Sequence, residues 1–434
     1  MLDIQFIRDN HEIVAQKSKL KGYGVDITRL LELDTKKREL VQAIDVIRQQ
    51  RNSLAEKLKK GKPSPEQLDE GRQLKNQVTD LEKQLTPVDE EFTMLLKAVP
   101  NMPLEDVPAG ASEEENKVSK TWGEKPAFDF KPKTHGELAE AKGWIDKERA
   151  AKVAGARFAY LSGSLVELQF AIINFVFKTL GDEQLIERLI QQEKLDLVAK
   201  GFVPMLPPLM LKTNVYEAMD RLEPRDDRYR VGEDKDDLWL EGSAEHTLGP
   251  IFMDEILPQQ SLPIRYVGYA ASFRREAGSY GKDTEGIIRM HQFDKLEMEV
   301  FSTPESGLDE HFLLIALQEF MMQQLELPYQ VILKCTGDIG KPNARGIDLN
   351  VWMPGQNRYL ETHTADYMTD YQTRRLKTRL RQSDGQVRLA HTNDATAFAL
   401  GRIMAAIIEN NQTHDGHVTI PTVLQSFMSN KQQI

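Results

Sequence analysis

Four short segments in the second half of the chain carry residues that could bind a nucleotide or an amino acid. In the first, Ser272–Glu276 (SFRRE), Arg274 and Glu276 are two residues apart. On a strand, this spacing places both side chains on one face of the sheet. An arginine there can bind a phosphate or a carboxylate through two parallel hydrogen bonds, and a glutamate can accept one from an exocyclic amine. The same alternation also occurs on ordinary exposed edge strands.

The chain is expected to return as a second strand over Ile287–Glu299. Phe293 offers an aromatic ring on which a base could stack, and Glu297 and Glu299 share one face of this strand. Earlier in the chain, Gly242–His246 (GSAEH) places a hydroxyl beside a carboxylate at the end of a short strand. Such a pair can bind an ammonium group and a hydroxyl together, although a turn with an exposed glutamate would have the same sequence.

The other two segments lie closer to the end of the chain. Tyr359–Thr364 (YLETHT) offers carboxylate and hydroxyl oxygens of the type that Mg²⁺ prefers when it also contacts phosphates. His391–Asn411 predicts a helix of small and apolar residues, with Asp394 as its N-cap and Arg402 as one of its few charges. An arginine on such a helix either reaches to solvent or binds a phosphate. Each of the four segments also fits an ordinary structural role when taken alone.

The elements that must position these residues mix amphipathic helices with short strands. Strand-like runs follow one another without a helix between each pair, which favours an antiparallel sheet with helices packed on it over a doubly wound parallel sheet. No Walker A or GxGxxG segment occurs, so a nucleotide would not be bound by a Gly-rich strand-to-helix loop. The expected strands are Leu238–Leu240, Ile264–Ala271, Ile287–Val300, Tyr329–Cys335 and Ile347–Trp352. The expected helices are Leu165–Leu180, Asp182–Ala199 and Gly307–Leu325.

The first part of the chain predicts a different structure. Residues 28–99 form two stretches in which apolar residues alternate at spacings of three and four, the pattern of a coiled coil. Between them, Gly61–Gln67 (GKPSPEQ) contains a glycine and two prolines that stop a helix, so the chain must reverse there. The result is an antiparallel helical hairpin with arms of roughly 50 Å, at 1.5 Å rise per residue. Pro87, inside the second stretch, predicts a kink or a restart of the helix.

Charge and composition restrict the class of protein. The 434 residues carry a net charge of −11, which excludes a uniformly basic nucleic-acid binder. Asp26–Lys62 nevertheless has ten Lys or Arg against six Asp or Glu, which fits either a solvated coiled coil or an arm that contacts phosphates. A single cysteine, Cys335, excludes an intrachain disulfide and an all-cysteine zinc site. The sequence shows no signal peptide or membrane span, so we expect a cytoplasmic protein without membrane contact.

Taken together and in this order, the segments closely resemble those of the seryl-tRNA synthetases, a family of class II aminoacyl-tRNA synthetases. The resemblance covers almost the whole chain. It includes PNMP (Pro100–Pro103), FDFKPKTHGELAEA (Phe128–Ala141), FRREAGS and HQFDKLEM, VWMPGQ, YQTRRLKTR (Tyr371–Arg379) and the final LGR and ENNQ. It implies an α+β fold, in which a class II antiparallel sheet flanked by helices is preceded by an N-terminal antiparallel coiled-coil hairpin. A tRNA-binding domain would span residues 1–110, and the catalytic domain residues 111–434.

The resemblance also implies a reaction and its partners. Serine and ATP would give seryl-adenylate and pyrophosphate, and the seryl group would then move to the terminal ribose of serine tRNA. Selenocysteine tRNA is left open as a further substrate. ATP would be a substrate and Mg²⁺ the metal, without zinc. The protein would be a homodimer that pairs through the stretch around Gly201–Leu211 and binds tRNA with its coiled-coil arm.

Site residues follow from the resemblance position by position. Arg274 would hold the α-phosphate and the serine carboxylate, and Arg402 would face the γ-phosphate. The catalytic positions are Arg274, Glu297 and Arg402. The serine-binding positions are Ser243, Ala244, Glu245, Arg274, Glu297 and Thr396. The ATP-binding positions are Arg274, Arg275, Glu276, Met290, Phe293, Glu361, Thr362, His363, Thr364 and Arg402, of which Glu361 and Thr364 would also bind Mg²⁺.

Some positions depart from the family pattern. The family usually has Thr at Ser243, Arg at Glu285 and Asn at Asp394, and a Ser-Cys-Ser-Asn run where Thr364, Ala365, Asp366 and Tyr367 stand. Asp366 and Asp394 add negative charge near a site for anions, which Arg374, Arg375 or Mg²⁺ could offset. Two alternatives therefore stay open: a paralogue that binds RNA or protein without charging tRNA, and an ATP-dependent ligase for another amino acid or a carrier protein.

Overall fold

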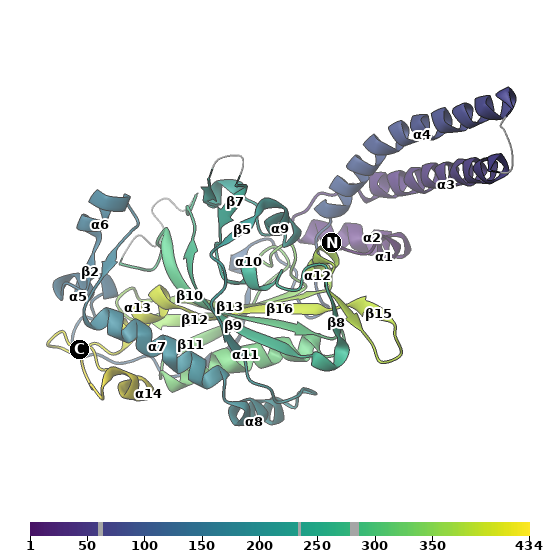
Figure 1. The fold of residues 1–434 in the computed structure, drawn as a ribbon. Coiled ribbons are helices and arrows are strands. Elements are labelled where there is room, and N and C mark those ends of the chain that lie inside the picture. The colour runs from purple at the N-terminus through teal and green to yellow at the C-terminus, as the bar shows by residue number, and fades with distance from the viewer. Residues whose placement is uncertain (60–63, 233–235, 278–285) are drawn as a thin grey trace. The chain divides into compact units, whose positions relative to one another are not determined.

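The computed structural model describes residues 1–59, 64–232, 236–277 and 286–434. It divides into two compact units, Met1–Met102 and Pro103–Ile434 (Figure 1). The functional division expected between residues 110 and 111 stays a prediction.

The N-terminal unit contains the predicted hairpin. Its helices are α1 (Ile4–Asp9), α2 (His11–Leu20), α3 (Ile27–Leu58) and α4 (Pro65–Ala98). The Asp26 carboxylate caps α3 by accepting from the Arg29 N–H, and Ser64 caps α4 in a capping box with Gln67. Two arms of 32 and 34 residues extend for about 50 Å, as expected. Part of the predicted reversal, residues 61–63, lies outside the described residues.

The coiled-coil stripe provides the contact between α3 and α4. The buried members of this stripe are Leu40, Ile44 and Leu54 on α3, and Leu74, Val78 and Phe92 on α4. Pro87 lies inside α4, which continues from Pro65 to Ala98, so the helix does not restart there. A proline within a helix removes one backbone hydrogen bond, and α4 continues across that loss.

The C-terminal unit is built on an eight-stranded sheet in the order β1-β11-β12-β13-β16-β10-β9-β4. Every neighbouring pair is antiparallel except β4 and β9. The strands are β1 (Lys117–Trp122), β4 (Val203–Met205), β9 (Ile264–Phe273), β10 (Gln292–Ser302), β11 (Tyr329–Leu333), β12 (Arg345–Met353), β13 (Arg358–Thr369) and β16 (His391–Ala399). The expected antiparallel sheet with packed helices is therefore confirmed.

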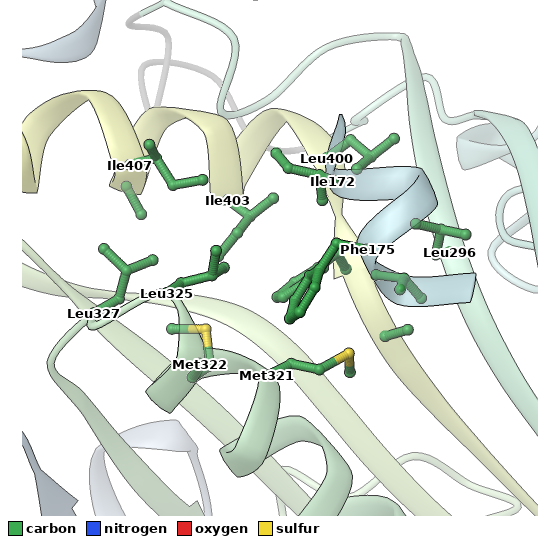
Figure 2. Packing of buried hydrophobic residues seen from close by; sticks show 14 of the residues in the cluster. Ile172, Phe175, Leu296, Met321, Met322, Leu325, Leu327, Leu400, Ile403 and Ile407 are labelled. Atoms are coloured by element: carbon green, nitrogen blue, oxygen red, sulfur yellow. The ribbon is translucent and has the colours of Figure 1, made fainter. Parts of the chain in front are cut away.

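One face of this sheet is covered by α7 (Ser164–Leu180), α11 (Gly307–Gln324) and α13 (Leu400–Asn410), which share the main apolar core. On β10, Leu296, Met298 and Val300 point into this core, and the intervening residues point to the opposite face. Figure 2 shows the centre of the core, with side chains from α7, α11, α13 and β10 in mutual contact. Its labelled residues are Ile172, Phe175, Leu296, Met321, Met322, Leu325, Leu327, Leu400, Ile403 and Ile407. The helices thus leave the other face of the sheet for polar side chains.

Smaller elements surround the sheet. They include α5 (His135–Ala141), α6 (Lys147–Ala154), α8 (Glu183–Glu193), α9 (Thr213–Ala218), α10 (Glu245–Leu248), α12 (Tyr371–Leu376) and α14 (Thr422–Gln425). Two three-stranded sheets contain β5 (Met210–Lys212), β7 (Leu238–Leu240) and β6 (Arg230–Val231), and β15 (Val387–Leu389), β14 (Arg379–Arg381) and β8 (Ile256–Pro258). A two-stranded sheet joins β2 (Ile145–Asp146) to β3 (Tyr160–Leu161).

Several local predictions were wrong. The strand expected over Ile287–Val300 begins only at Gln292, as β10. The strand β9 ends at Phe273, so Arg274 and Glu276 lie beyond it, and Glu276 has a positive φ of 53°. Asp394 lies inside β16 and is not an N-cap, because the helix begins only at Leu400. The helix expected over Asp182–Ala199 ends at Glu193, where Lys194 takes the left-handed conformation. In β16, small and apolar residues fill a buried strand, whose sequence cannot be told from that of a buried helix by periodicity alone.

Candidate active site

A cavity of about 110 Å³ lies on the face of the sheet opposite the helices. Its walls come from the end of β9, from β10, β13 and β16, and from the first turn of α13. It is lined by Arg274, Glu276, Ile287, Ile288, Arg289, Met290, Phe293, Lys295, Glu361, Thr362, Thr364, Thr396, Ala399, Gly401 and Arg402. Predicted residues from three of the four segments therefore meet in one cavity. Such a concave site with a few polar groups is the usual form of a small-molecule site.

Arg274 is held at the cavity by two contacts. Its Nε donates to the Gly242 carbonyl at 2.9 Å, and its guanidinium lies 5.3 Å from the centre of the Phe293 ring. The first contact joins the loop after β9 to the loop that carries Ser243. The second is a cation–π interaction with the ring predicted to stack on a base. Arg274 thus connects the nucleotide-binding candidates to the amino-acid-binding candidates.

Glu276 and Arg289 form an ion pair in the cavity wall, with 2.5 Å between Arg289 Nη1 and Glu276 Oε2. Both residues line the cavity, one before and one after the segment 278–285. The departure at Glu285 lies in that segment, outside the described residues. An acceptor for an exocyclic amine is therefore present at this wall, oriented by a neighbouring guanidinium.

Arg402, in the first turn of α13, lines the cavity and pairs with Glu361. Its Nη1 is 2.8 Å from the Glu361 carbonyl oxygen and 3.1 Å from Glu361 Oε1. Burial would raise the pKa of Glu361, but Arg402, Lys334 and Arg274 together hold it below its usual value. Glu361 is therefore ionised at neutral pH. Because α13 begins at Leu400 without a side-chain cap, its N-terminus also presents backbone N–H groups that favour an anion.

The amino-acid-binding candidates form a second, more deeply buried group. Lys295 bridges two of them, with its Nζ 2.5 Å from Glu297 Oε2 and 2.9 Å from Ser243 Oγ. Thr396 is paired with Glu297 across β10 and β16. Thr396 and Lys295 line the cavity, whereas Ser243, Glu245 and Glu297 are buried behind them. The sequence analysis did not identify Lys295, although its spacing of two from Glu297 on a strand indicated the same face.

Burial dominates the charge state of this group. It raises the pKa of Glu297 to about 8, against the opposing effect of the Lys295 ammonium. Glu245 and Asp394 add to the rise, because each places negative charge nearby. A cation entering the group would favour the ionised form of Glu297. The group is therefore suited to bind an ammonium together with a hydroxyl.

Three buried carboxylates lie directly opposite one another behind this group. Glu299 on β10 is paired with Asp394 on β16, and Asp394 with Asp366 on β13. Arg221 donates from Nη2 to Asp394 Oδ2 at 3.0 Å. Burial raises the pKa of Asp394 to about 7 despite Arg221, and burial beside Asp394 raises the pKa of Glu299 well above its usual value. Like charges opposite one another destabilise a sheet, so Glu299 and Asp394 hold their protons to a higher pH than exposed carboxyl groups do.

Two of the side chains predicted to offset this negative charge, Arg374 and Arg375, form ion pairs with other carboxylates. Arg374 pairs with Asp370 at 2.6 Å, and Arg375 pairs with Asp220 at 2.8 Å. Arg221 takes the role instead. It comes from a loop far from the four segments in sequence, so no local pattern indicated it.

Besides Ser243, Glu245 and Glu297, three predicted residues do not line the cavity. Arg275 is exposed, donates from Nε to the Arg228 carbonyl at 3.1 Å and lies 4.9 Å from the centre of the Tyr229 ring. His363 is buried against Phe398, and burial lowers its pKa to about 3. Ala244 packs in a small apolar cluster. Side chains alternate along β13, which explains why His363 does not line the cavity although its neighbours Thr362 and Thr364 do.

The described residues were also searched for metal sites and membrane spans. Within the described ranges, no group of three His, Cys, Asp or Glu side chains is arranged to hold a metal ion. No single described helix is long and apolar enough to cross a membrane, although the bent pair α7 and α8 passes by length and composition.

Comparisons with known proteins agree along the chain. A family model described as the seryl-tRNA synthetase N-terminal domain matches residues 1–103, and one described as the tRNA synthetase class II core domain (G, H, P, S and T) matches residues 229–411. A serine–tRNA ligase of Geobacter sp. (strain M21) is 38% identical, and one of Nitrosopumilus maritimus 36%, each over 100% of both chains.

Solved structures give the same result. The chain superposes with a TM-score of 0.88 on seryl-tRNA synthetase from Pyrococcus horikoshii complexed with ATP, at 35% identity, covering 100% of this chain and 99% of the other. It superposes with a TM-score of 0.84 on the cytoplasmic serine–tRNA ligase of Naegleria fowleri in complex with AMP, at 25% identity and with coverage of 100% and 98%.

Proposed function

This chain belongs to the seryl-tRNA synthetase family, and from this premise we propose how its cavity and its arm perform the reaction. It is an ATP-dependent serine–tRNA ligase, which activates serine with ATP and aminoacylates tRNA. The open alternatives of a non-charging paralogue and of a ligase for another amino acid are disfavoured by the agreement along the whole chain.

ATP would occupy the cavity with its base on Phe293 and its phosphates between Arg274 and Arg402. Glu276 would accept a hydrogen bond from the adenine amine, and the N-terminus of α13 would face the phosphates. Two guanidiniums held by Gly242 and Glu361 are oriented before the substrate arrives. Attack of the serine carboxylate on the α-phosphorus needs no nucleophilic side chain, because positioning and stabilisation of developing charge provide the catalysis.

Serine would bind in the buried group formed by Ser243, Glu245, Glu297 and Thr396. Its ammonium would pair with a glutamate and its hydroxyl would satisfy a buried acceptor. Alanine lacks that hydroxyl and would leave the acceptor unpaired, which can reduce kcat/KM by orders of magnitude. Lys295 now contacts both Ser243 and Glu297, so it would define how deeply the amino acid enters.

Mg²⁺ would be held by Glu361 and Thr364. The donor set fits, since both residues line the cavity, Glu361 is ionised and the Thr364 hydroxyl oxygen is buried. The ion would neutralise charge on the phosphates of ATP when bound.

The coiled-coil arm would bind serine tRNA. Many of its cations pair with acids one helical turn away, including Lys36, Arg48, Lys59 and Lys83, here called the paired arm cations. Within the described ranges, four exposed cations have no acidic partner: Arg51, Lys57, Arg72 and Lys75, here called the distal arm cations. A Cβ atom placed on Gly71 of α4 would lie 3.7 Å from Leu54 Cδ2 of α3. The four distal arm cations are close in sequence to these two positions, so they occupy one region of the hairpin. They would contact phosphates and read the shape of the RNA.

A second copy of the chain would cover the apolar surface around the edge strand β4. Val203, Leu206, Leu209 and Met210 are exposed there within a few residues of one another. Such a patch favours self-association. We expect a homodimer by sedimentation at micromolar concentration, and a monomer would refute this part of the proposal. A cytoplasmic location is proposed on the family relationship alone.

The convergence of Arg274, Phe293, Glu361 and Arg402 on one cavity carries the proposal. It is tested by pyrophosphate exchange with each of the twenty amino acids. We expect exchange with serine and a signal at least 100-fold lower with alanine and threonine, followed by charging of serine tRNA. Exchange with a different amino acid, or none, would overturn the proposed substrate.

A further inference from the structure

A buried histidine outside the cavity supports the wall of the nucleotide site. His135, the first residue of α5, has a fully buried side chain, and so has Glu409 in the last turn of α13. His135 Nδ1 lies 2.9 Å from Glu409 Oε1, and His135 Nε2 lies 3.3 Å from the backbone N of Ile287. Ile287 lines the cavity. A chain of hydrogen bonds therefore runs from α13 through His135 to the cavity wall.

The hydrogen bonds fix the tautomer of His135. The Ile287 N–H is a donor, so His135 Nε2 must be the unprotonated acceptor. The proton then lies on Nδ1 and is donated to the Glu409 carboxylate. Both nitrogens of the ring are therefore used in hydrogen bonds. Neither nitrogen is exposed to solvent, so this arrangement is determined by the fold and not by water.

The backbone around Ile287 fits this support closely. A side chain at Gly286, whose φ is +54°, would collide with His135 Nε2. A side chain at Gly401 would come within 2.7 Å of the Ile287 carbonyl oxygen. The Ile287 peptide is thus held on its N–H side by His135 and on its carbonyl side by the first turn of α13. It is also among the first described residues after the segment 278–285.

Glu409 connects this support to a second part of the structure. Its carboxylate accepts from the backbone N–H of His135 at 3.1 Å, of Gly355 at 3.0 Å, and from Gln356 Nε2 at 3.0 Å. A carboxylate with so many donors is strongly oriented. The first turn of α13 carries Gly401 and Arg402 at the cavity, and its last turn carries Glu409, which contacts His135. Movement of Ile287 is therefore resisted by the element that also carries Arg402.

We infer that His135 and Glu409 are positioning residues for ATP, which hold the Ile287 peptide in its place in the cavity wall beside the first turn of α13. This inference rests on the proposed function of the cavity. Neither residue touches substrate, so each acts through Ile287. The effect is confined to the nucleotide, because Ser243, Glu297 and Thr396 belong to other elements and have no hydrogen bond to His135.

Two substitutions separate the two hydrogen bonds of the imidazole. In His135→Asn, the amide nitrogen replaces Nδ1 and still donates to Glu409, but nothing reaches the Ile287 N–H. In His135→Gln, the amide oxygen replaces Nε2 and still accepts from Ile287, but the bond to Glu409 is lost. His311→Asn is the matched control: His311 is also fully buried, contacts Arg345 at 2.9 Å and lies away from the cavity.

The measurement is serine-dependent pyrophosphate exchange by the full-length protein, with KM for ATP and for serine determined separately and thermal unfolding recorded for each variant. We expect His135→Asn to raise KM for ATP about three- to tenfold, with KM for serine within twofold, as the loss of one hydrogen bond implies. His135→Gln should raise KM for ATP less than His135→Asn does. His311→Asn should lower the midpoint of unfolding without a change in either KM.

The inference is overturned if His135→Asn behaves like His311→Asn, or if KM for ATP and KM for serine rise together. It is also overturned if His135→Gln raises KM for ATP more than His135→Asn. Failure of the proposed function would look different, because the unchanged protein would then show no serine-dependent exchange, whatever the His135 variants do.

Discussion

The role of Arg274 can be tested by a single conservative change, Arg274→Lys. The lysine keeps the positive charge. It loses the Nε–H that donates to the Gly242 carbonyl at 2.9 Å and the planar group that lies 5.3 Å from the Phe293 ring centre. A lysine also binds a phosphate as a point charge and cannot present two parallel donors. The substitution therefore separates charge from geometry.

The expected magnitude follows from the contacts that are lost. Removing one oriented donor to the developing charge in a transition state costs about 2.7–4 kcal/mol, or 100- to 1000-fold in kcat. The ring contact adds about 0.5–2 kcal/mol at a partly desolvated site. These contributions are not independent, so we expect a fall of at least 100-fold in kcat for serine-dependent pyrophosphate exchange. KM for tRNA in the charging reaction should stay within threefold, because the arm is unchanged.

The neighbouring residue supplies the control. Arg275→Lys makes the same chemical change one residue away, on a side chain that is exposed and lies against Arg228 and Tyr229. We expect exchange within threefold of the unchanged protein. Equal losses in the two variants, or a loss below tenfold in Arg274→Lys, would refute the assignment of Arg274 to the α-phosphate.

Two further predictions concern the buried acids and the arm. In the folded protein the pKa of Glu299 is well above its usual value, so the stability that Glu299 contributes is fully present below about pH 4.5 and is lost as pH rises toward the folded pKa. Glu299→Gln removes this pH-dependent loss of stability. In urea titrations from pH 5 to 8, the free energy of unfolding of the variant minus that of the unchanged protein should rise with pH, by at most about 1.4 kcal/mol per pH unit. A constant difference would show that Glu299 does not titrate in this range. Replacing the distal arm cations by glutamine should leave pyrophosphate exchange unchanged and raise KM for serine tRNA. It should also reduce the slope of log KM for tRNA against log salt concentration by roughly one for each phosphate contact removed. The same change in the paired arm cations should have little effect on any of these quantities, and similar effects of the two sets would remove the proposed role of the distal arm cations.

The arm and the sheet could be predicted from the sequence because their signals are local. The alternation of three and four over residues 28–99 specifies paired helices, and successive strand-like runs specify antiparallel pairing. The error at Asp394 has the opposite cause. Its neighbours are small and apolar, and only the pairing of β16 with β10 and β13 makes this segment a strand. Periodicity contains no information on such pairing.

The site was predicted unevenly for the same reason. Arg274 and Glu276 were found through their spacing, but the strand ends at Phe273 and a positive φ at Glu276 directs that side chain toward the cavity wall. Lys295, Arg221 and His135 were missed because each acts through a partner far away in sequence: Ser243, Asp394 and Ile287 respectively. Residues of this kind become visible only when the fold brings their partners together.

The most direct test of the account is a structure of the protein with a non-hydrolysable analogue of seryl-adenylate. We expect the adenine on Phe293, the phosphate mimic between Arg274 and Arg402, and the seryl group behind Lys295 against Glu297 and Thr396. An analogue bound elsewhere, or bound in the cavity with its seryl group directed away from Glu297, would contradict the assignment.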